Sequence, residues 1–192
     1  AGYRAAHRAL DGGAIFSDPL ARGILGGQGD AIIAALSADP RQKPARIFMA
    51  ARSRFGEDSL ATAVRRGVRQ AVVLGAGLDT LSLRNPHTKL GLRIFEVDHP
   101  ATQAWKLRRL DEVGYVVPTS TTFASIDFER QELGSCLQGA GFDPRRSAFF
   151  LWLGVVPYLR SAAISATLRY ISSVPESEVV FDYSEPLENY PP

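Results

Sequence analysis

The chain has 192 residues, of which 45% are hydrophobic and 22% are charged, as is typical of one soluble globular domain with a sizeable core. The 22 basic and 20 acidic residues leave a net charge of +2, which argues against a nucleic-acid partner, because such proteins concentrate basic charge. No apolar run approaches the roughly 18 residues that span a bilayer, so we expect no membrane partner either. The single cysteine, Cys136, excludes a disulfide within the chain and fits a cytoplasmic location.

The first 69 residues predict a helical cap or lid. A short helical pattern covers residues 30–36, with Asp30 as a candidate N-cap. Between 44 and 66, apolar residues recur at a spacing of three to four, which predicts a helix that begins near Pro44 and ends before Gly67. Gly56 is a candidate break that would divide this segment into two helices.

From residue 70 onward, short apolar runs alternate with helical segments. This order predicts βαβ units, a mostly parallel sheet and helices on both faces. We therefore expect one compact domain with an α/β core over 70–192, preceded by the cap over 1–69. The expected strands cover 71–74, 92–97, 119–126, 148–153 and 178–183. The expected helices cover 100–113, 129–140 and 161–174, the last of them capped by Ser161.

The segment VVLGAGLDT, residues 72–80, is the strongest local signal for a binding site. A buried strand runs into Gly75 and Gly77, and glycines there allow a tight turn and let a ligand touch the main chain. Asp98 ends the next strand about 20 residues later, where an acid can accept hydrogen bonds from ribose hydroxyls. The alternative is a plain glycine turn with Asp98 capping the helix that begins at Pro100.

Two classes of cofactor use this layout. A dinucleotide site usually has a third glycine, because the pyrophosphate lies against a helix N-terminus. Thr80 occupies that position, and Asp79 beside it is unfavourable for a pyrophosphate but compatible with a cationic adenosyl donor. The sequence also lacks a Tyr-x-x-x-Lys pair. A nicotinamide-dependent oxidoreductase, NAD(P)-linked, and a cofactor-binding domain without catalysis remain the alternatives.

Five ordered motifs carry a resemblance to a known family. They are AARSRFGEDSL at 50–60, VVLGAGLDT at 72–80, FEVDHPATQAWK at 95–106, GVVPYL at 154–159 and VVFDYSEPL at 179–187. Together they resemble the leucine carboxyl methyltransferase family, most closely its bacterial small-molecule-type members. The resemblance implies a Rossmann-like methyltransferase fold with S-adenosyl-L-methionine as cofactor. Because family members normally continue through two more strands, it also implies that strands are missing after Pro192.

The resemblance assigns cofactor-binding roles to individual residues. Arg52 matches the arginine that pairs with the carboxylate of the cofactor's methionine part, and a guanidinium suits this task because it grips a carboxylate with two hydrogen bonds. Ordinary surface charge is the alternative for Arg52. Gly75 and Gly77 match the glycine loop. Asp98 matches the ribose-binding acid, with Glu96 as the second choice.

The adenine end of the cofactor is assigned to a later segment. Asp127 and Phe128 match residues that flank the adenine, where Asp127 would accept from the exocyclic amine. A helix N-cap is the alternative for Asp127. Leu153 departs from the pattern, because members with protein substrates carry an acid there, and this leaves the acceptor open. Trp152 and Tyr158 could line the acceptor pocket, although buried aromatic core is the commoner role.

The sequence offers no clear candidate for a catalytic general base, and this favours an acceptor that is already ionised. A carboxylate has a pKa of about 4 and is ionised at neutral pH, whereas a phenol at about 10 would need a general base. The three histidines, His7, His87 and His99, have no partner spacing that suggests a base. We therefore expect O-methylation of a small-molecule carboxylic acid, with no obligatory catalytic side chain and no metal site.

Overall fold

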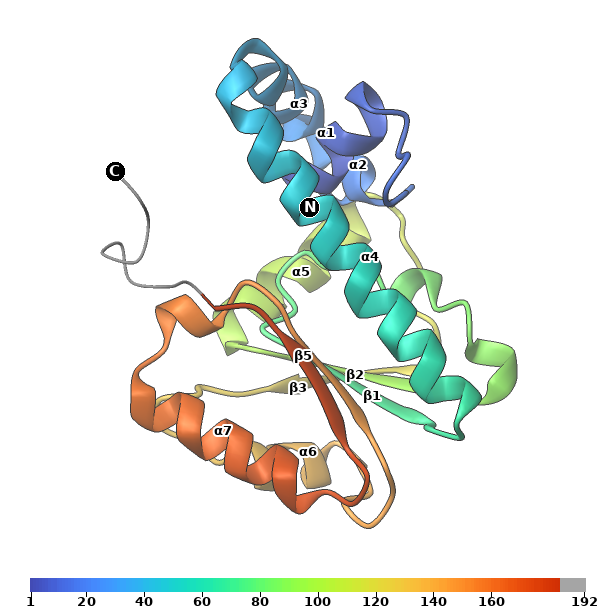
Figure 1. Ribbon diagram of the computed structural model, residues 1–192, viewed down its shortest axis with the longest axis vertical. Helices are drawn as coiled ribbons and strands as arrows, with labels where there is room; N and C mark the ends of the chain where they lie inside the picture. The colour runs from blue at the N-terminus through green and yellow to red at the C-terminus, as the bar shows by residue number, and fades with distance from the viewer. Residues whose placement is uncertain (184–192) are drawn as a thin grey trace.

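A five-stranded parallel sheet forms the centre of the computed structural model, which describes residues 1–183 (Figure 1). The strand order is β3-β2-β1-β4-β5. The strands are β1 (Gln70–Leu74), β2 (Arg93–Asp98), β3 (Thr121–Ser125), β4 (Phe149–Trp152) and β5 (Glu178–Phe181). The α/β class and the parallel sheet predicted from the sequence are confirmed. The motif at 179–187 extends beyond the described residues.

Helices cover both faces of the sheet, as predicted. One face packs against α4 (Lys43–Arg65) and also carries α5 (Pro100–Glu112), while α6 (Leu133–Gly139) and α7 (Ser161–Ser173) cover the other. Because successive strand residues point to opposite faces, β1, β2, β4 and β5 each contribute to two apolar clusters. The cluster under α4 includes Leu60, Ala63, Val73, Ile94 and Leu151. The cluster under α6 and α7 includes Val72, Phe95, Leu137, Phe150 and Ile171.

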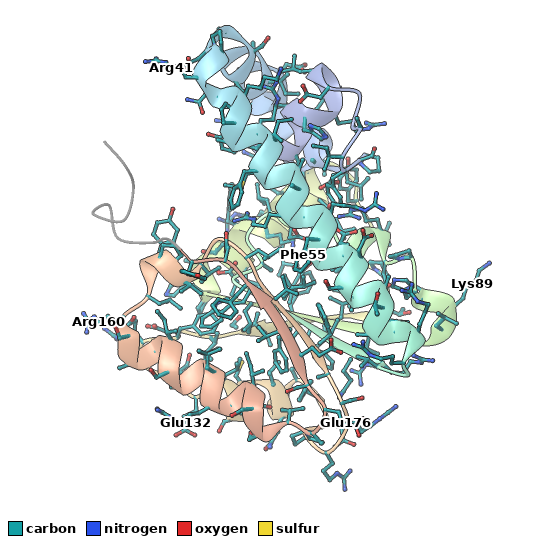
Figure 2. All side chains as sticks on the ribbon, in the orientation of Figure 1. Arg41, Phe55, Lys89, Glu132, Arg160 and Glu176 are labelled. Carbon is teal, nitrogen blue, oxygen red and sulfur yellow. The ribbon has the colours of Figure 1, made fainter. Side chains whose placement is uncertain are left out.

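Three N-terminal helices gather around the first half of α4, beyond the carboxyl ends of the strands (Figure 1). They are α1 (Gly2–Leu10), α2 (Ala21–Ile24) and α3 (Gly29–Ala38). The sequence pattern indicated only the last of them, because the side chains that α1 and α2 bury are mostly small. Asp30 does not cap α3: it lies inside the first turn and pairs with Arg22. Arg41 marks the end of this helical group farthest from the sheet (Figure 2).

Short 3-10 helices complete the described chain: η1 (Gly26–Gln28), η2 (Pro40–Gln42), η3 (Ser82–Arg84), η4 (Thr88–Leu90) and η5 (Val156–Tyr158). None of the helices within residues 1–183 has the length and apolar character required to cross a bilayer.

Gly56 does not break α4, which continues through it. The reason for a glycine here lies in tertiary packing. A Cβ built at Gly56 would lie 2.8 Å from Leu151 Cδ2, so the absence of a side chain allows α4 to approach β4 closely. The candidate break is therefore a contact point between helix and sheet, and it sets the position of the neighbouring turn of α4 over the carboxyl end of β4.

Two other helix starts differ from the sequence prediction. The N-cap of α7 is Arg160, whose side chain makes no capping hydrogen bond, and Ser161 is the first helical residue. Helix α6 begins at Leu133 and not near residue 129, because residues 127–131 form a turn. In that turn Gln131 Oε1 accepts a hydrogen bond from Asp127 N at 2.9 Å, and Asp127 Oδ1 accepts one from the nitrogen of Glu129 at 3.0 Å.

Candidate functional site: the carboxyl edge of the sheet

The glycine loop follows β1 directly and requires its glycines for two reasons. Gly75 and Gly77 have φ angles of 64° and 48°, in the left-handed region that side chains disfavour. A Cβ on Gly75 would also collide with the side chain of Val155, which follows β4. The loop is tied to the neighbouring strand, since Gly75 N donates to the carbonyl oxygen of Val97 at 2.7 Å. Its main chain is thus held at the edge where open α/β sheets bind ligands.

Asp98 lies at the end of β2 with its carboxylate against this loop. Its Oδ2 accepts a hydrogen bond from Gly77 N at 2.5 Å, and its Oδ1 accepts one from the nitrogen of His99 at 2.7 Å. An ionised carboxylate has about four acceptor positions, so acceptor capacity remains for a ligand. Asp98 is not the cap of α5. That role belongs to His99, whose Nδ1 accepts from Ala101 N at 3.2 Å.

Glu96, the second candidate for a ribose-binding acid, is buried away from this edge. Its carboxylate accepts hydrogen bonds from Ser82 Oγ and from Lys106 Nζ. Burial raises the pKa of Glu96, and the nearby charge of Lys106 opposes that rise. Lys106 also donates to the carbonyl oxygen of Asp79 at 2.6 Å. Glu96 therefore links β2, α5 and the loop after β1 from inside the protein.

A cavity of about 180 Å³ opens beside the glycine loop. Its wall brings together residues from the N-terminal helices, from α4 and from the ends of β1 and β4. Among them are Arg4, Arg52, Ser53, Glu57, Gly75, Ala76, Asp79 and Leu153. Two arginines and two acids give this small cavity a mixed charge.

Arg52 reaches the cavity from α4. Its side chain is 16% exposed, and Nη1 pairs with Asp182 Oδ2. The guanidinium lies against the main chain that follows β4, because a Cβ on Gly154 would lie 3.0 Å from Nη1. The Nε atom is buried and has no hydrogen-bond partner among the described residues. A buried donor without a partner costs about 1–3 kcal/mol, so this side of Arg52 suits an acceptor supplied by a ligand.

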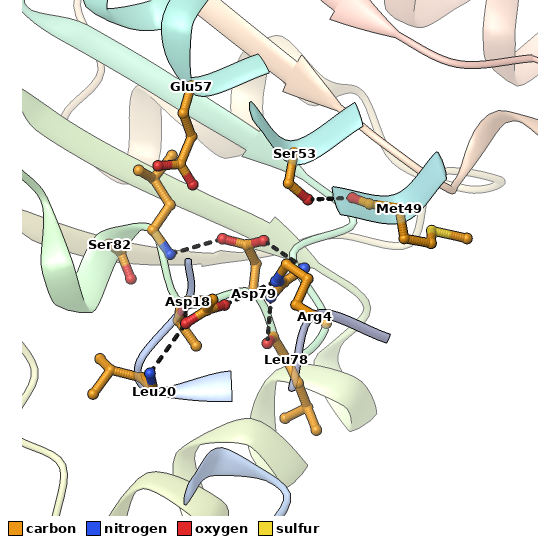
Figure 3. A network of polar contacts seen from close by, with 12 residues as sticks. Arg4, Asp18, Leu20, Met49, Ser53, Glu57, Leu78, Asp79 and Ser82 are labelled. Atoms are coloured by element: carbon orange, nitrogen blue, oxygen red, sulfur yellow. Dashed lines mark hydrogen bonds and ion pairs between the residues drawn. The ribbon is translucent and has the colours of Figure 1, made fainter. Parts of the chain in front are cut away.

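A network of charges joins the N-terminal helices to the glycine loop (Figure 3). Arg4 of α1 donates to Asp18 Oδ2 at 2.8 Å and to the carbonyl oxygen of Leu78 at 3.3 Å, and its Nη1 lies 3.3 Å from the carboxylate of Asp79. The Asp18 carboxylate is fully buried and also accepts from Thr80 Oγ1 at 2.8 Å.

Glu57 of α4 belongs to the same charged region and pairs with Arg84 of η3, with Arg84 Nη1 donating to Glu57 Oε2 at 2.8 Å. Sequence reasoning missed Arg4, Asp18, Glu57 and Arg84 as parts of the site. No short motif could have indicated these pairs, because the partners lie 14 to 27 residues apart.

The network also changes the role expected of Asp79. Burial would raise the pKa of this carboxyl, but the charges of Arg4 and Lys106 and the backbone N–H of Leu81 together lower it to about 2. Asp79 is thus ionised and paired, and it does not present an unbalanced negative charge to a cofactor. The charge of Asp79 is therefore a weaker argument against a dinucleotide cofactor than the sequence suggested. Burial raises the pKa of Glu57, and Arg84 opposes the rise.

The comparisons with known proteins agree with the motifs. A family model described as leucine carboxyl methyltransferase matches residues 1–172. The chain belongs to the leucine carboxyl methyltransferase family. A Bacillus subtilis (strain 168) protein, YktD, is 37% identical over 137 residues, which cover 70% of this chain and 45% of YktD. Its name describes it provisionally as an S-adenosyl-L-methionine-dependent methyltransferase.

Two further relatives carry the same provisional description. A Rhodococcus jostii (strain RHA1) protein is 32% identical, with 88% of this chain and 58% of the relative covered. A Mycobacterium leprae (strain TN) protein is 30% identical, with 91% of this chain and 58% of the relative covered. The chain therefore spans about half the length of the curated relatives it matches.

The residues that the family resemblance assigned to the cofactor form two groups: one lies at or beside the cavity, and the other, Asp127 and Phe128, lies farther along the same edge of the sheet. Gly75 and Arg52 share the cavity, and Gly77 and Asp98 are hydrogen-bonded beside it. Asp127 lies next along the same edge, because Ile126 N donates to the carbonyl oxygen of Asp98 at 2.8 Å. Asp127 is not the N-cap of α6, which is Glu132.

The side chains of the adenine-flanking segment are placed differently from one another. The carboxylate of Asp127 holds its own turn and lies 3.5 Å from Arg130 Nε, and it is 30% exposed. The Phe128 ring is partly buried and packs against the cluster under α6 and α7. Neither residue lines the cavity. Of the two aromatic candidates for an acceptor pocket, Trp152 is fully buried in the core and Tyr158 is 85% exposed.

Proposed function

We propose that the protein is an S-adenosyl-L-methionine-dependent methyltransferase that methylates a carboxylate oxygen of a small molecule. The observation that carries the proposal is the buried, unpartnered Nε of Arg52, a residue that lines the cavity beside the glycine loop. Family membership supports the same donor and does not favour a nicotinamide cofactor. The donor class and the acceptor class are separate parts of the proposal and have separate tests.

The residues of the edge fit the donor part by part. Arg52 would hold the methionine carboxylate through the nitrogen atoms that Asp182 leaves available. The turn at Gly75 and Gly77 would let the adenosyl group lie against the main chain. Asp98 would accept from the ribose hydroxyls, and Asp127 would accept from the adenine amine. When bound, this donor supplies an electrophilic methyl group on a positively charged sulfur.

The ionisable groups of the cavity support an acceptor that arrives already charged. No histidine is among the described residues that line the cavity. Its two acids are committed to arginines, Glu57 to Arg84 and Asp79 to Arg4, so neither is a ready general base. A carboxylate acceptor, with a pKa of about 4, needs no proton removed at neutral pH. The protein would then act mainly by orientation and by excluding water, effects that together contribute on the order of 7–11 kcal/mol.

Calorimetry tests the donor. We expect S-adenosylhomocysteine to bind and NADH to give no heat under the same conditions. Replacing Arg52 by Gln should weaken S-adenosylhomocysteine about tenfold or more, because a charge-assisted hydrogen bond contributes about 1.5–3 kcal/mol. Arg54→Gln on the same helix is the matched control, since Arg54 pairs with Asp58 at an exposed position. NADH binding without S-adenosylhomocysteine binding would overturn the proposal.

Methyl transfer tests the acceptor. A panel of small carboxylic acids is incubated with radiolabelled S-adenosyl-L-methionine, beside the corresponding primary amides and a matched set of phenols. We expect label in base-labile methyl esters of one or more acids and none in the amides. Label confined to phenols would refute the carboxylate acceptor while leaving the donor intact. Donor binding with no transfer to any acid would favour a cofactor-binding domain without catalysis.

A further inference from the structure

Asp182 lies immediately after β5, outside every role assigned so far. Phe181, the residue before it, is in register with Trp152 of β4, so Asp182 comes beside Leu153 in the next row of the sheet. Residues in one row of a parallel sheet face the same way. Leu153 packs on the α4 side and lines the cavity, and Asp182 likewise reaches α4, where it meets Arg52.

The carboxylate of Asp182 joins three elements. Its Oδ1 accepts a hydrogen bond from Gly154 N at 2.5 Å, which ties the end of β5 to the loop after β4. Its Oδ2 pairs with Arg52 Nη1, which ties that loop to α4. The side chain is only 20% exposed. Asp182 therefore fixes where the guanidinium of Arg52 lies, against Gly154 and at the rim of the cavity.

The two acids among the described residues that line the cavity, Glu57 and Asp79, have partners other than Arg52. Asp79 pairs with Arg4, and Glu57 pairs with Arg84. Asp182 is the acid that pairs with Arg52, and it leaves the Nε of that arginine without a partner among residues 1–183. A cation and an anion held side by side match the two charges of an α-amino acid, whose carboxylate and ammonium sit on one carbon atom.

We infer that Asp182 and Arg52 form a two-residue receptor for the α-amino-acid end of the methyl donor. Asp182 positions Arg52 for the donor's carboxylate and presents its own charge to the donor's ammonium. Leu153, its neighbour in the sheet, contributes only an apolar wall, so the negative charge at this place comes from β5. This inference rests on the proposed donor, because it concerns how one end of that molecule is recognised.

The test compares two ligands that differ only at that end. S-adenosylhomocysteine carries the α-amino acid, and 5′-methylthioadenosine keeps the adenosyl thioether but lacks it. Asp182→Asn removes the charge and preserves the size and an oxygen that can accept from Gly154. We expect it to weaken S-adenosylhomocysteine about tenfold or more in calorimetry, and to change methylthioadenosine by less than about twofold.

Matched variants keep the result interpretable. Asp30→Asn removes an acid that pairs with Arg22 on the exposed surface, and it should leave both affinities unchanged. Asp182→Glu restores the charge and should recover part of the loss. In the Arg52→Gln background, Asp182→Asn should still weaken S-adenosylhomocysteine, because the ammonium contact is independent of the guanidinium.

The outcomes separate the inference from the proposed function. If Asp182→Asn weakens both ligands equally, or neither, the two-residue receptor is wrong although the donor site stands. If Asp182→Asn has no effect once Arg52 is replaced, the ammonium contact is wrong. If the unmodified protein binds neither ligand, the proposed donor itself is wrong.

Discussion

Arg4 Nη1 lies 3.3 Å from Asp79 Oδ2, and this contact joins the first helix of the chain directly to the glycine loop. Asp18 completes the link, because its buried carboxylate accepts from Arg4 and from Thr80. The helical cap expected over 1–69 is thus connected to the core by buried charges.

Replacing Arg4 by Gln should destabilise the fold strongly. The change leaves the carboxylates of Asp18 and Asp79 without their main cation, and removing one partner of a buried pair costs about 3–5 kcal/mol. The free energy of unfolding, measured by urea titration, reports the loss. Arg22→Gln is the control, because Arg22 and Asp30 form an exposed pair that should contribute little. Equal effects of the two substitutions would show that the network adds no stability.

Asp79 should make stability depend on pH in the acid range. Its pKa is lowered to about 2, against about 3.9 in an unfolded chain. A carboxyl whose pKa is lowered on folding stabilises above the unfolded pKa, and the contribution is lost as pH falls through the folded pKa. We therefore expect the urea midpoint to fall between about pH 4 and pH 2.

Asp79→Asn identifies the source of that dependence. The variant should lose less stability than the unmodified protein between about pH 4 and pH 2. Some dependence should remain, because hydrogen bonding from Arg46 also lowers the pKa of Asp11 to about 2. Identical pH profiles for the two proteins would assign the acid sensitivity to other carboxyls.

Substitutions at Lys106 and Glu96 test whether losing one charge of this buried ion pair destabilises the protein more than losing both. Their side chains are 2% and 1% exposed. Lys106→Met should cost about 3–5 kcal/mol, because it leaves a buried carboxylate without its cation. The double variant Lys106→Met, Glu96→Leu should be more stable than Lys106→Met alone, since it removes both charges. A double variant less stable than the single one would show that Glu96 is held chiefly by Ser82.

Gly56 should not tolerate a side chain, although it lies in a helix. Alanine favours the helix over glycine by about 1 kcal/mol, but its Cβ would lie 2.8 Å from Leu151 Cδ2, and such overpacking costs about 1–3 kcal/mol. We expect Gly56→Ala to lower the thermal midpoint. Gly139→Ala in α6, where a Cβ meets nothing within 4 Å, should leave it unchanged or raise it. The reverse order would contradict the close approach of α4 to β4.

Asp98 should affect every adenosyl ligand alike, in contrast to Asp182. If Asp98 accepts from the ribose hydroxyls, Asp98→Asn removes hydrogen bonds to a charged group, each contributing about 1.5–3 kcal/mol. Both S-adenosylhomocysteine and 5′-methylthioadenosine should then weaken about tenfold or more in calorimetry. A variant that binds both ligands normally would remove Asp98 from the ribose site.

Local sequence patterns account for the secondary structure of this protein, and tertiary packing accounts for the contacts between its elements. The amino-acid sequence was sufficient to predict the parallel α/β class, because alternating strand and helix periods are local. It also located the loop at Gly75 and Gly77, because a strand followed by glycines is a local pattern too. The expected strands agree with the observed ones to within two residues at every end. Family motifs then named Arg52 and Asp98 as candidates in advance.

Tertiary structure alone decided which charges meet. Arg52 and Asp182 are 130 residues apart, and Arg84 and Glu57 are 27 apart, so nothing in their neighbouring residues marks them as partners. Packing also overturned one local expectation. Gly56 was a candidate break in a helix, but it is the point where α4 contacts the sheet. Such contacts depend on how whole elements dock, and side-chain periodicity carries information only about the face that each element buries.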